Sequence, residues 1–256
     1  MPKQTIAVIN QKGGVGKTTT AVNLSAYLAH LGRTVLLVDF DPQGNATSGL
    51  GLDKENLASS SYDVLSEPSM LSSSIVKTAV PKLSLLPTNS SLSSAEIELA
   101  NQENREYKLQ NVLKSANYDY VIIDCPPALG LLTINALTAA KSLLIPVQAE
   151  YYAMEGLGQL LRLIQRARET VNPDLAILGI VMTMYDRRTT LAQQVHDELM
   201  QHFKDMLFQT IIPRNIRLAE APSFGKPISE HDKWSRGGRA YKQLAKEVDN
   251  RVRQTA

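Results

Sequence analysis

The sequence has little cysteine, few aromatic residues and no long apolar run. Cys125 is the only cysteine among 256 residues, which excludes an internal disulfide and argues against a metal site built on several cysteines of one chain. No segment reaches the ~18 consecutive apolar residues that a transmembrane helix needs. The apolar run at residues 5–9 has the length of a strand and leads into a glycine-rich loop, unlike a signal peptide. We therefore expect a cytoplasmic protein with no membrane partner.

The charges nearly cancel along the chain. The formal net charge is +2, which is too small to indicate a partner by itself. Between Lys226 and Arg253, however, eight Lys or Arg residues stand against four Asp or Glu residues. The basic excess therefore gathers toward the C-terminal end, while 43% apolar residues leave ample material for a core.

Short apolar runs alternate with helical patterns. The run Val35 to Val38 is continuously apolar, which is typical of strands covered on both faces in a parallel sheet. Strands are predicted at residues 5–10, 34–39, 120–124, 142–147, 176–183 and 207–212. Helices are predicted at residues 18–31, 132–140, 157–171, 191–203 and 239–252. Repeated β-α-β units with right-handed crossovers predict an α/β fold, a three-layer sandwich with a mostly parallel central sheet.

Residues 53–92 fit this alternation poorly, because they are rich in serine and only weakly periodic. Edge strands are possible at residues 74–78 and 83–87. Ser93 and Glu96 have the spacing of a capping box that begins a helix. We interpret residues 53–92 as surface excursions and expect one domain spanning residues 1–256.

A glycine-rich loop lies between the first predicted strand and the first predicted helix. It reads Lys12, Gly13, Gly14, Val15, Gly16, Lys17, Thr18 and Thr19. Backbone N–H groups of such a loop surround phosphates, Lys17 reaches the β- and γ-phosphates, and the Thr18 hydroxyl binds Mg²⁺. The first glycine of the usual pattern would fall at Gln11, and Lys12 is an additional lysine. The loop is therefore a deviant Walker A motif, which predicts a P-loop NTPase with ATP and Mg²⁺ as ligands.

Carboxylates end two of the predicted strands. Asp39 and Asp41 follow one strand, and Asp124 ends another in the manner of a Walker B motif. Ligands of open α/β sheets bind beyond the carboxyl ends of the strands, so these side chains should converge on the phosphates. Asp124 would then hold Mg²⁺, directly or through water.

Five segments together resemble one known family. They are residues 11–20, 36–50, 118–127, 212–228 and 235–237. The chain resembles the ParA/Soj chromosome- or plasmid-partitioning ATPases of the ParA/MinD deviant Walker A superfamily. The resemblance covers most of the chain and is weakest at residues 53–92.

The resemblance implies a role for each site residue. Lys12 would cross a nucleotide-sandwich homodimer to the partner's ATP, while Lys17, Thr18 and Thr19 would bind phosphates within their own chain. Asp41 would position the attacking water, and Asp124 would support Mg²⁺. Pro213, Arg214 and Asn215 lie where the family holds the adenine base.

The resemblance also implies partners. The ATP-bound dimer would bind double-stranded DNA without sequence preference, placing it on the nucleoid, and a ParB-type centromere-binding protein would stimulate hydrolysis and release it. The candidate DNA contacts are basic residues, since phosphate contacts need only positive charge on one face. They are Arg188, Arg217, Arg236, Arg239 and Lys242.

Three other functions are alternatives to this interpretation. A MinD-like cell-division ATPase needs an amphipathic C-terminal membrane helix, and residues 250–256 show no bulky apolar face. A nitrogenase-type iron protein needs two cysteines per subunit, against one here. A P-loop small-molecule kinase or synthetase stays open, as does chromosomal against plasmid origin. The first strand begins by Thr5, so we expect no helix-turn-helix extension before it and no operator-specific binding.

Overall fold

Apolar strands form a central sheet in the computed structural model, which describes residues 2–255. The strands are β1 (Gln4–Val8), β2 (Val35–Asp39), β3 (Val76–Lys77), β4 (Leu83–Leu86), β5 (Tyr120–Asp124), β6 (Ser142–Gln148) and β7 (Ala176–Thr183). Within the described residues the sheet has seven strands in the order β3-β4-β2-β5-β1-β6-β7, and only β3 is antiparallel to its neighbour.

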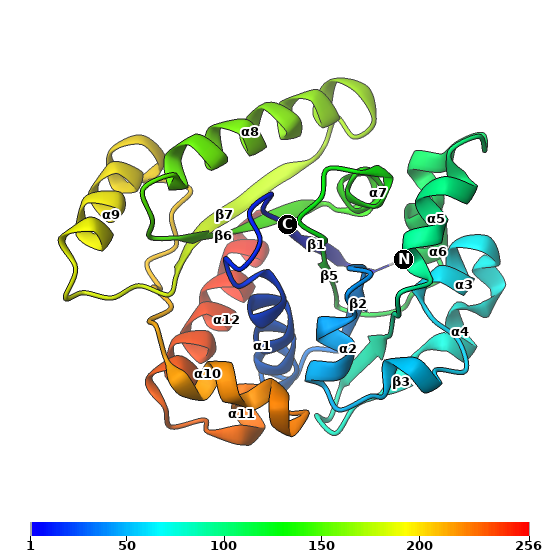
Figure 1. The fold of residues 1–256 in the computed structure, drawn as a ribbon, viewed down its shortest axis with the longest axis horizontal. Helices are drawn as coiled ribbons and strands as arrows, with labels where there is room; N and C mark the ends of the chain where they lie inside the picture. The colour runs from blue at the N-terminus through cyan, green and yellow to red at the C-terminus, as the bar shows by residue number, and fades with distance from the viewer. Residues whose placement is uncertain (1, 256) are drawn as a thin grey trace.

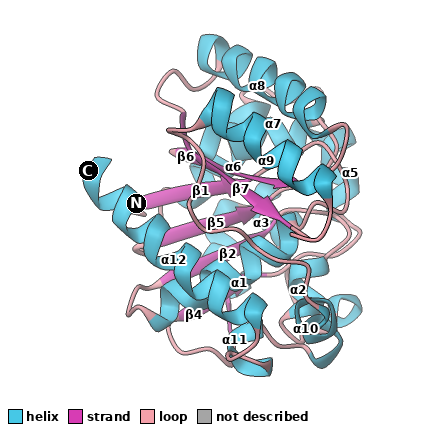
Figure 2. Ribbon diagram, turned by 90° about the vertical axis from the view of Figure 1, so that its left-hand side faces the viewer, coloured by secondary structure: helices cyan, strands magenta, loops and turns pink. Residues whose placement is uncertain are grey.

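Helices cover both faces of this sheet (Figures 1 and 2). The helices are α1 (Lys17–His30), α2 (Asn45–Gly49), α3 (Ser61–Ser66), α4 (Leu71–Ser74), α5 (Leu92–Leu99), α6 (Lys108–Leu113), α7 (Leu131–Ala139), α8 (Ala153–Thr170), α9 (Thr190–Phe203), α10 (Ile216–Glu220), α11 (Ile228–His231) and α12 (Arg236–Thr255). Helices α1 and α12 lie on one face, whereas α7 and α8 lie on the other. The predicted three-layer α/β sandwich is confirmed.

Alternate residues of each inner strand supply two separate cores. On β2, Leu36 and Val38 face the α7 and α8 side, while Val35 and Leu37 face α1 and α12. All four are fully buried. Burial on both faces explains why the strand is continuously apolar rather than alternating.

Residues 207–212 do not form the predicted strand. A single bridge links Leu207 to Ile180 of β7. The Glu247 carboxylate of α12 accepts the backbone N–H groups of Gln209 at 2.9 Å and Thr210 at 3.1 Å. Because a side chain takes these donors, the segment does not continue the sheet as a regular strand, and this prediction was wrong.

Residues 53–92 are more than surface excursions, which corrects the interpretation made from the sequence. Strand β4 lies inside the sheet beside β2, and of the two strands in this segment only β3 is at an edge. Val64 and Leu71 are buried in the core. Serine-rich helices hide this role, because each is too short to show a period.

The capping box predicted at Ser93 is absent. Helix α5 begins at Leu92, and the Glu96 carboxylate accepts the N–H of Leu132 at 3.3 Å. A capping box does occur at Ser60 and Asp63, where α3 begins. The capping box therefore occurs two α-helices earlier in the chain than predicted.

The sheet register sets the position of the site. Asp39 at the end of β2 pairs with Asp124 at the end of β5, which in turn pairs with Val8 of β1. The three carboxyl ends therefore meet at one edge, where β1 leads into the glycine-rich loop and α1.

Candidate functional site

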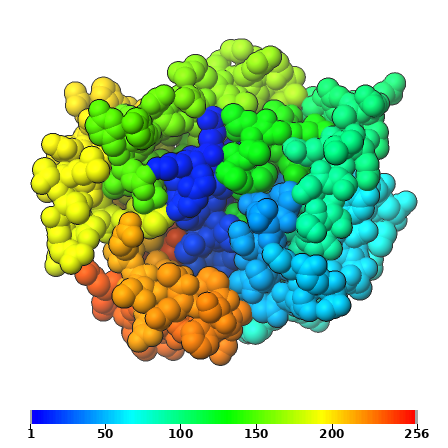
Figure 3. Space-filling view, in the orientation of Figure 1, coloured from blue at the N-terminus to red at the C-terminus, as the bar shows by residue number. Residues whose placement is uncertain are grey.

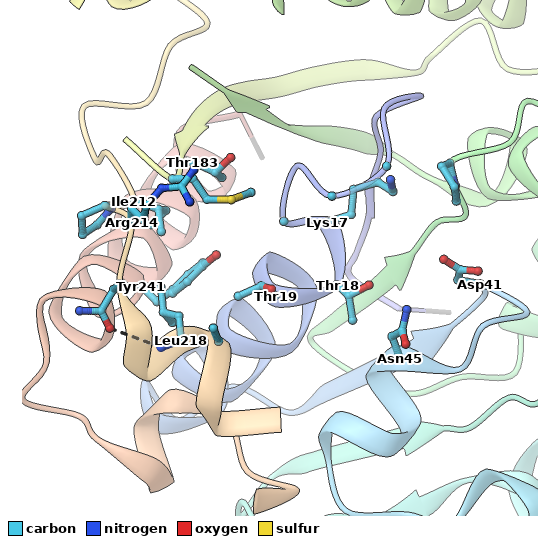
Figure 4. A pocket seen from close by; sticks show the side chains of 18 of the residues that line it. Lys17, Thr18, Thr19, Asp41, Asn45, Thr183, Ile212, Arg214, Leu218 and Tyr241 are labelled. Carbon is cyan, nitrogen blue, oxygen red and sulfur yellow. Dashed lines mark hydrogen bonds between the residues drawn. The ribbon is translucent and has the colours of Figure 1, made fainter. Parts of the chain in front are cut away.

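A cavity of about 500 Å³ opens at this edge of the sheet. Figure 4 shows it from close by, and in Figure 3 the loop after β1 lies at the surface near the centre of the molecule. Its lining includes Gly13, Gly14, Gly16, Lys17, Thr18, Thr19, Asp41, Asn45, Pro213, Arg214, Asn215 and Tyr241. The phosphate-binding residues and the adenine-binding residues expected from the sequence thus share one cavity, although two hundred residues separate them.

The glycine-rich loop owes its shape to two glycines with positive φ. Gly14 has φ 76° and Gly16 has φ 86°, a region that residues with a Cβ rarely adopt. The Thr183 hydroxyl at the end of β7 donates to the Val15 carbonyl at 2.8 Å and anchors the loop. Val15, which was also predicted to contact the cofactor, is buried. Its side chain therefore packs in the interior, and only its backbone can face the cofactor.

Helix α1 begins at Lys17 directly after the loop and has no acidic residue in its first turn. Its N-terminus therefore presents free N–H groups and uncompensated positive charge to the cavity. Lys17 is buried, and its Nζ donates to the Lys12 carbonyl at 3.1 Å. Burial lowers the pKa of Lys17, and the nearby Asp124 and Asp41 act in the opposite direction.

Three buried carboxylates meet beside Lys17. Asp39 accepts the N–H of Thr47 at 2.7 Å and its hydroxyl at 2.6 Å, so Asp39 fixes the turn after β2. Burial raises the pKa of Asp39 to about 7, and Asp41 adds to the increase. Asp41 differs, because it lines the cavity and its carboxylate accepts only the N–H of Gln43, at 3.0 Å, among the bonds of the described residues.

Asp124 is a buried carboxylate without a hydrogen-bond partner of good geometry in the described part of the chain, as expected of a cation ligand. It is fully buried, and neither carboxylate oxygen has a hydrogen-bond partner of good geometry among residues 2–255. Burial and the neighbouring Asp39 raise the pKa of Asp124, whereas Thr18 and Lys17 lower it. Mg²⁺ is usually held by one or two carboxylates together with substrate phosphates and water, so Asp124 and Thr18 fit a Mg²⁺ site.

The other end of the cavity is apolar and lies between β7 and α12. Ile212, Leu218 and Tyr241 contribute buried side chains, and the Tyr241 hydroxyl lies 3.1 Å from that of Thr20. Asn215 caps α10 by accepting the N–H of Leu218 at 3.3 Å. Met184 lines the same end with φ 49°, which is unusual for a residue with a side chain.

Lys12 does not line this cavity. Its Nζ instead forms an ion pair with the carboxylate of Glu150, in the loop after β6. Both side chains are more than 40% exposed. The two lysines of the motif therefore have different surroundings, one buried among phosphate-binding groups and the other at the surface.

A second hollow, of about 770 Å³, lies behind the apolar end of the cavity. Five arginines line it, and we call it the arginine groove: Arg187, Arg188, Arg214, Arg236 and Arg239. Three of the predicted DNA contacts thus lie together. Arg217 lies outside the lining and pairs with Glu220 at 2.9 Å, and Lys242 also lies outside it.

Sequence reasoning missed several lining residues. Thr183 is the last residue of β7 and Met184 directly follows it, so the rule that ligands bind at the carboxyl ends of strands could have found both. Asn45 lies four residues after Asp41, so the same rule could have identified it as a lining residue. Tyr241 lies in the interior of α12, where nothing in the sequence indicates a ligand contact.

Comparisons with known proteins agree with this geometry. Residues 3–177 match a family described as an AAA domain. The sporulation initiation inhibitor protein Soj of Bacillus subtilis is 54% identical over 245 residues, which cover 95% of this chain and 97% of that protein. The chain belongs to the ParA/Soj family. The chromosome partitioning protein ParA of Myxococcus xanthus is 50% identical over 248 residues, covering 96% of this ParA/Soj chain and 88% of its own.

The solved structures show the same fold. This ParA/Soj chain superimposes with a TM-score of 0.86 on cobyrinic acid a,c-diamide synthase from Mycobacterium smegmatis with bound ADP and magnesium. The two are 38% identical, and the match covers 99% of this chain and 96% of that one. The protein is a P-loop ATPase and a chromosome-partitioning family member, as predicted. Between residues 2 and 255, no helix combines the length and apolar character that crossing a bilayer requires.

Proposed function

We propose that this protein is a single-domain, Mg²⁺-dependent ATPase of DNA segregation, extending over residues 1–256, of which Met1 and Ala256 lie outside the described part. The ATP-bound homodimer binds double-stranded DNA without sequence preference and therefore sits on the nucleoid. A ParB-type partner stimulates hydrolysis and so releases the dimer from DNA.

The observation that carries this proposal is the different placement of the two loop lysines. Lys17 is buried at the phosphate end of its own cavity, whereas Lys12 is exposed and held outside it by Glu150. A lysine whose side chain lies outside its own cavity can reach the nucleotide of a second copy once it leaves Glu150. A positive charge supplied in trans to transferring phosphoryl groups is worth roughly 10³ to 10⁵ in rate.

The same geometry supports the remaining roles in this proposal. Lys17, Thr18, Thr19 and the loop N–H groups hold the phosphates, and Asp41, which lines the same cavity, orients the attacking water. Bound Mg²⁺, held by Thr18 and Asp124, would neutralise phosphate charge. Pro213, Arg214 and Asn215 border the space for adenine.

DNA binding is proposed on the charge of the arginine groove. Arg187, Arg214, Arg236 and Arg239 form no ion pair with any described carboxylate, and Arg188 pairs only with Asp186, at 2.6 Å. Guanidinium groups bind phosphate oxygens in bidentate fashion, so a cluster of unpaired arginines suits a phosphate backbone. Arg217 and Lys242 lie outside the groove lining and are proposed as further contacts.

The test is ATP-dependent binding to random-sequence duplex DNA, with and without a ParB-type protein. We expect retention on DNA with a non-hydrolysed ATP analogue, and release when the partner is added with ATP. Equal retention with ADP would contradict the proposal.

A small-molecule synthetase is the second candidate, favoured by the likeness to the structure named as a synthase. A synthetase passes phosphate to an acceptor, whereas a partitioning ATPase passes it only to water. A synthetase that joins two groups also releases the phosphate as inorganic phosphate once the second group displaces it, so the diagnostic result is phosphate release that requires an added acceptor, or a phosphorylated acceptor trapped before that release.

A further inference from the structure

The nucleotide cavity and the arginine groove lie on opposite sides of one layer of residues, and Pro213 and Arg214 line both. We define the shared wall as residues 183–188, 211–216 and 236–241. Along each segment, neighbouring residues face opposite hollows: Met184 lines the cavity and Tyr185 the groove, and Tyr241 lines the cavity and Ala240 the groove.

Backbone hydrogen bonds hold the wall together. The Tyr185 N–H donates to the Ile212 carbonyl at 3.1 Å, and the Arg214 N–H donates to the Tyr185 carbonyl at 3.1 Å. The helical segment also packs closely on the wall, since a Cβ added at Gly237 would lie 3.2 Å from the Asn215 side-chain oxygen. We therefore expect a side chain that moves on the cavity side of this wall to shift residues on the groove side.

Pro213 and Arg214 line both hollows. The proline ring is rigid, whereas the arginine side chain is long, exposed and without a hydrogen bond or ion pair in the described part of the chain. Figure 4 shows Arg214 beside Ile212 and Thr183, at the apolar end of the nucleotide cavity. The side chain can therefore extend toward the base site or into the groove.

We propose that Arg214 couples nucleotide binding to DNA binding, an inference that rests on the proposed function. A base that fills the apolar end of the cavity takes the space beside Ile212 and leaves the groove as the place for the guanidinium. The groove then presents one more phosphate-binding group. A ligand that favours one of two side-chain positions shifts the population toward it.

Electrostatics inside the groove support this placement. Asp186 is the one carboxylate in the lining described for the groove, and it pairs with Arg188. Arg188 lowers the pKa of Asp186 most, and Arg214 contributes to the same decrease. The positive charge of Arg214 thus acts on a carboxylate inside the groove. A DNA phosphate bound there would attract the Arg214 guanidinium further.

Thermodynamic reciprocity provides the test. If nucleotide raises DNA affinity through Arg214, then DNA raises nucleotide affinity by the same factor. The affinity for a fluorescent, non-hydrolysed ATP analogue is measured with and without a saturating short duplex of random sequence. The proteins are wild type, Arg214→Ala and two matched variants, Arg187→Ala inside the groove and Lys246→Ala outside it.

We expect the duplex to raise analogue affinity in the wild type, and Arg214→Ala to reduce that enhancement by about fivefold or more. Arg187→Ala should weaken DNA binding but keep the enhancement, because Arg187 lines only the groove. Lys246→Ala should change neither. Light scattering at a saturating concentration of the analogue should show that Arg214→Ala still forms a dimer, which separates a lost coupling from weaker binding of the base beside Arg214.

Three results would overturn the inference. They are an unchanged enhancement in Arg214→Ala, an equal loss in Arg187→Ala, or a loss of dimerisation in Arg214→Ala that accounts for the effect. A wild type that binds no duplex with the analogue would instead refute the proposed function, so the two failures are distinguishable.

Discussion

The phosphate end of the nucleotide cavity and the arginine groove differ in burial, in charge and in origin along the chain. Lys17, Asp39 and Asp124 are buried and come from strand ends and the start of one helix. The groove arginines come from loops and the first turn of α12, and Arg188 is 84% exposed. Buried charges hold a fixed geometry that chemistry requires, whereas exposed charges attract any phosphate backbone without selecting a sequence.

The comparison predicts that changes at the buried end alter rates and that changes in the groove alter DNA affinity. Effects should be large at the buried end, where each group has few substitutes. Single changes in the groove should reduce DNA affinity by small, additive amounts, because five arginines contribute to phosphate binding there.

The largest effect is expected at Asp41. Asp41→Ala should spare ATP binding and reduce hydrolysis by about 10² to 10⁴, because an unplaced water reacts slowly. The variant should accumulate as an ATP-bound dimer that stays on DNA. Steady-state phosphate release measures this, with Asp174→Ala, an exposed acid before β7, as the control. Hydrolysis at the wild-type rate would exclude Asp41, and Asp39 would be the next candidate.

The second effect concerns dimerisation. A Cβ added at Gly13 meets nothing within 4 Å, so Gly13→Val should fold and bind ATP like the wild type. If two loops face each other across the nucleotides, the added bulk should cost about 1–3 kcal/mol at their contact. Light scattering should find a monomer with ATP, with Gly13→Ala between the two. An ATP-dependent dimer of wild-type affinity would show that the loops do not meet.

The third effect is a pH dependence at the buried end. The pKa of Asp39 is raised from 3.8 to about 7, so between these values the folded protein holds a proton that the unfolded chain releases. The free energy of unfolding should therefore be highest at low pH within this window and fall as the pH rises toward 7. Asp39→Asn should flatten the profile in urea titrations of nucleotide-free protein. Parallel profiles for the two proteins would refute the assignment.

The smallest effect is expected at the exposed pair of Lys12 and Glu150. An exposed ion pair contributes at most about 1 kcal/mol, so Glu150→Gln should strengthen ATP-dependent dimerisation by no more than about fivefold. The reason is that Lys12 no longer has to leave a carboxylate before it crosses to the partner. Glu155→Gln, in the first turn of α8, is the matched control. Weaker dimerisation of Glu150→Gln would mean that Glu150 supports the interface.

The sequence predicted most residues at the phosphate end of the nucleotide cavity, but only three of the five arginines of the groove. A strand, a glycine loop and a helix are contiguous, so the position of Lys17 is set locally, and the strand-end rule placed Asp39 and Asp124. Arg187 and Arg214 were not recognised as groove residues, because the groove combines three segments that only the tertiary fold brings together. Strand β4 was predicted as an edge strand, because its inner neighbour β2 lies far earlier in the chain, although its outer neighbour β3 directly precedes it.

Duplex DNA binding across a salt series tests the central claim most directly. Wild-type protein is titrated with two unrelated duplexes, with a non-hydrolysed ATP analogue and without nucleotide, alongside Arg217→Glu. We predict binding that requires the analogue, does not distinguish the duplexes, and falls with log[salt] at a slope of about −0.9 per phosphate neutralised. Arg217→Glu should weaken binding to both duplexes and leave nucleotide binding unchanged. Binding that is independent of salt, or that needs no nucleotide, would contradict the order of ATP, dimer and DNA proposed for this protein.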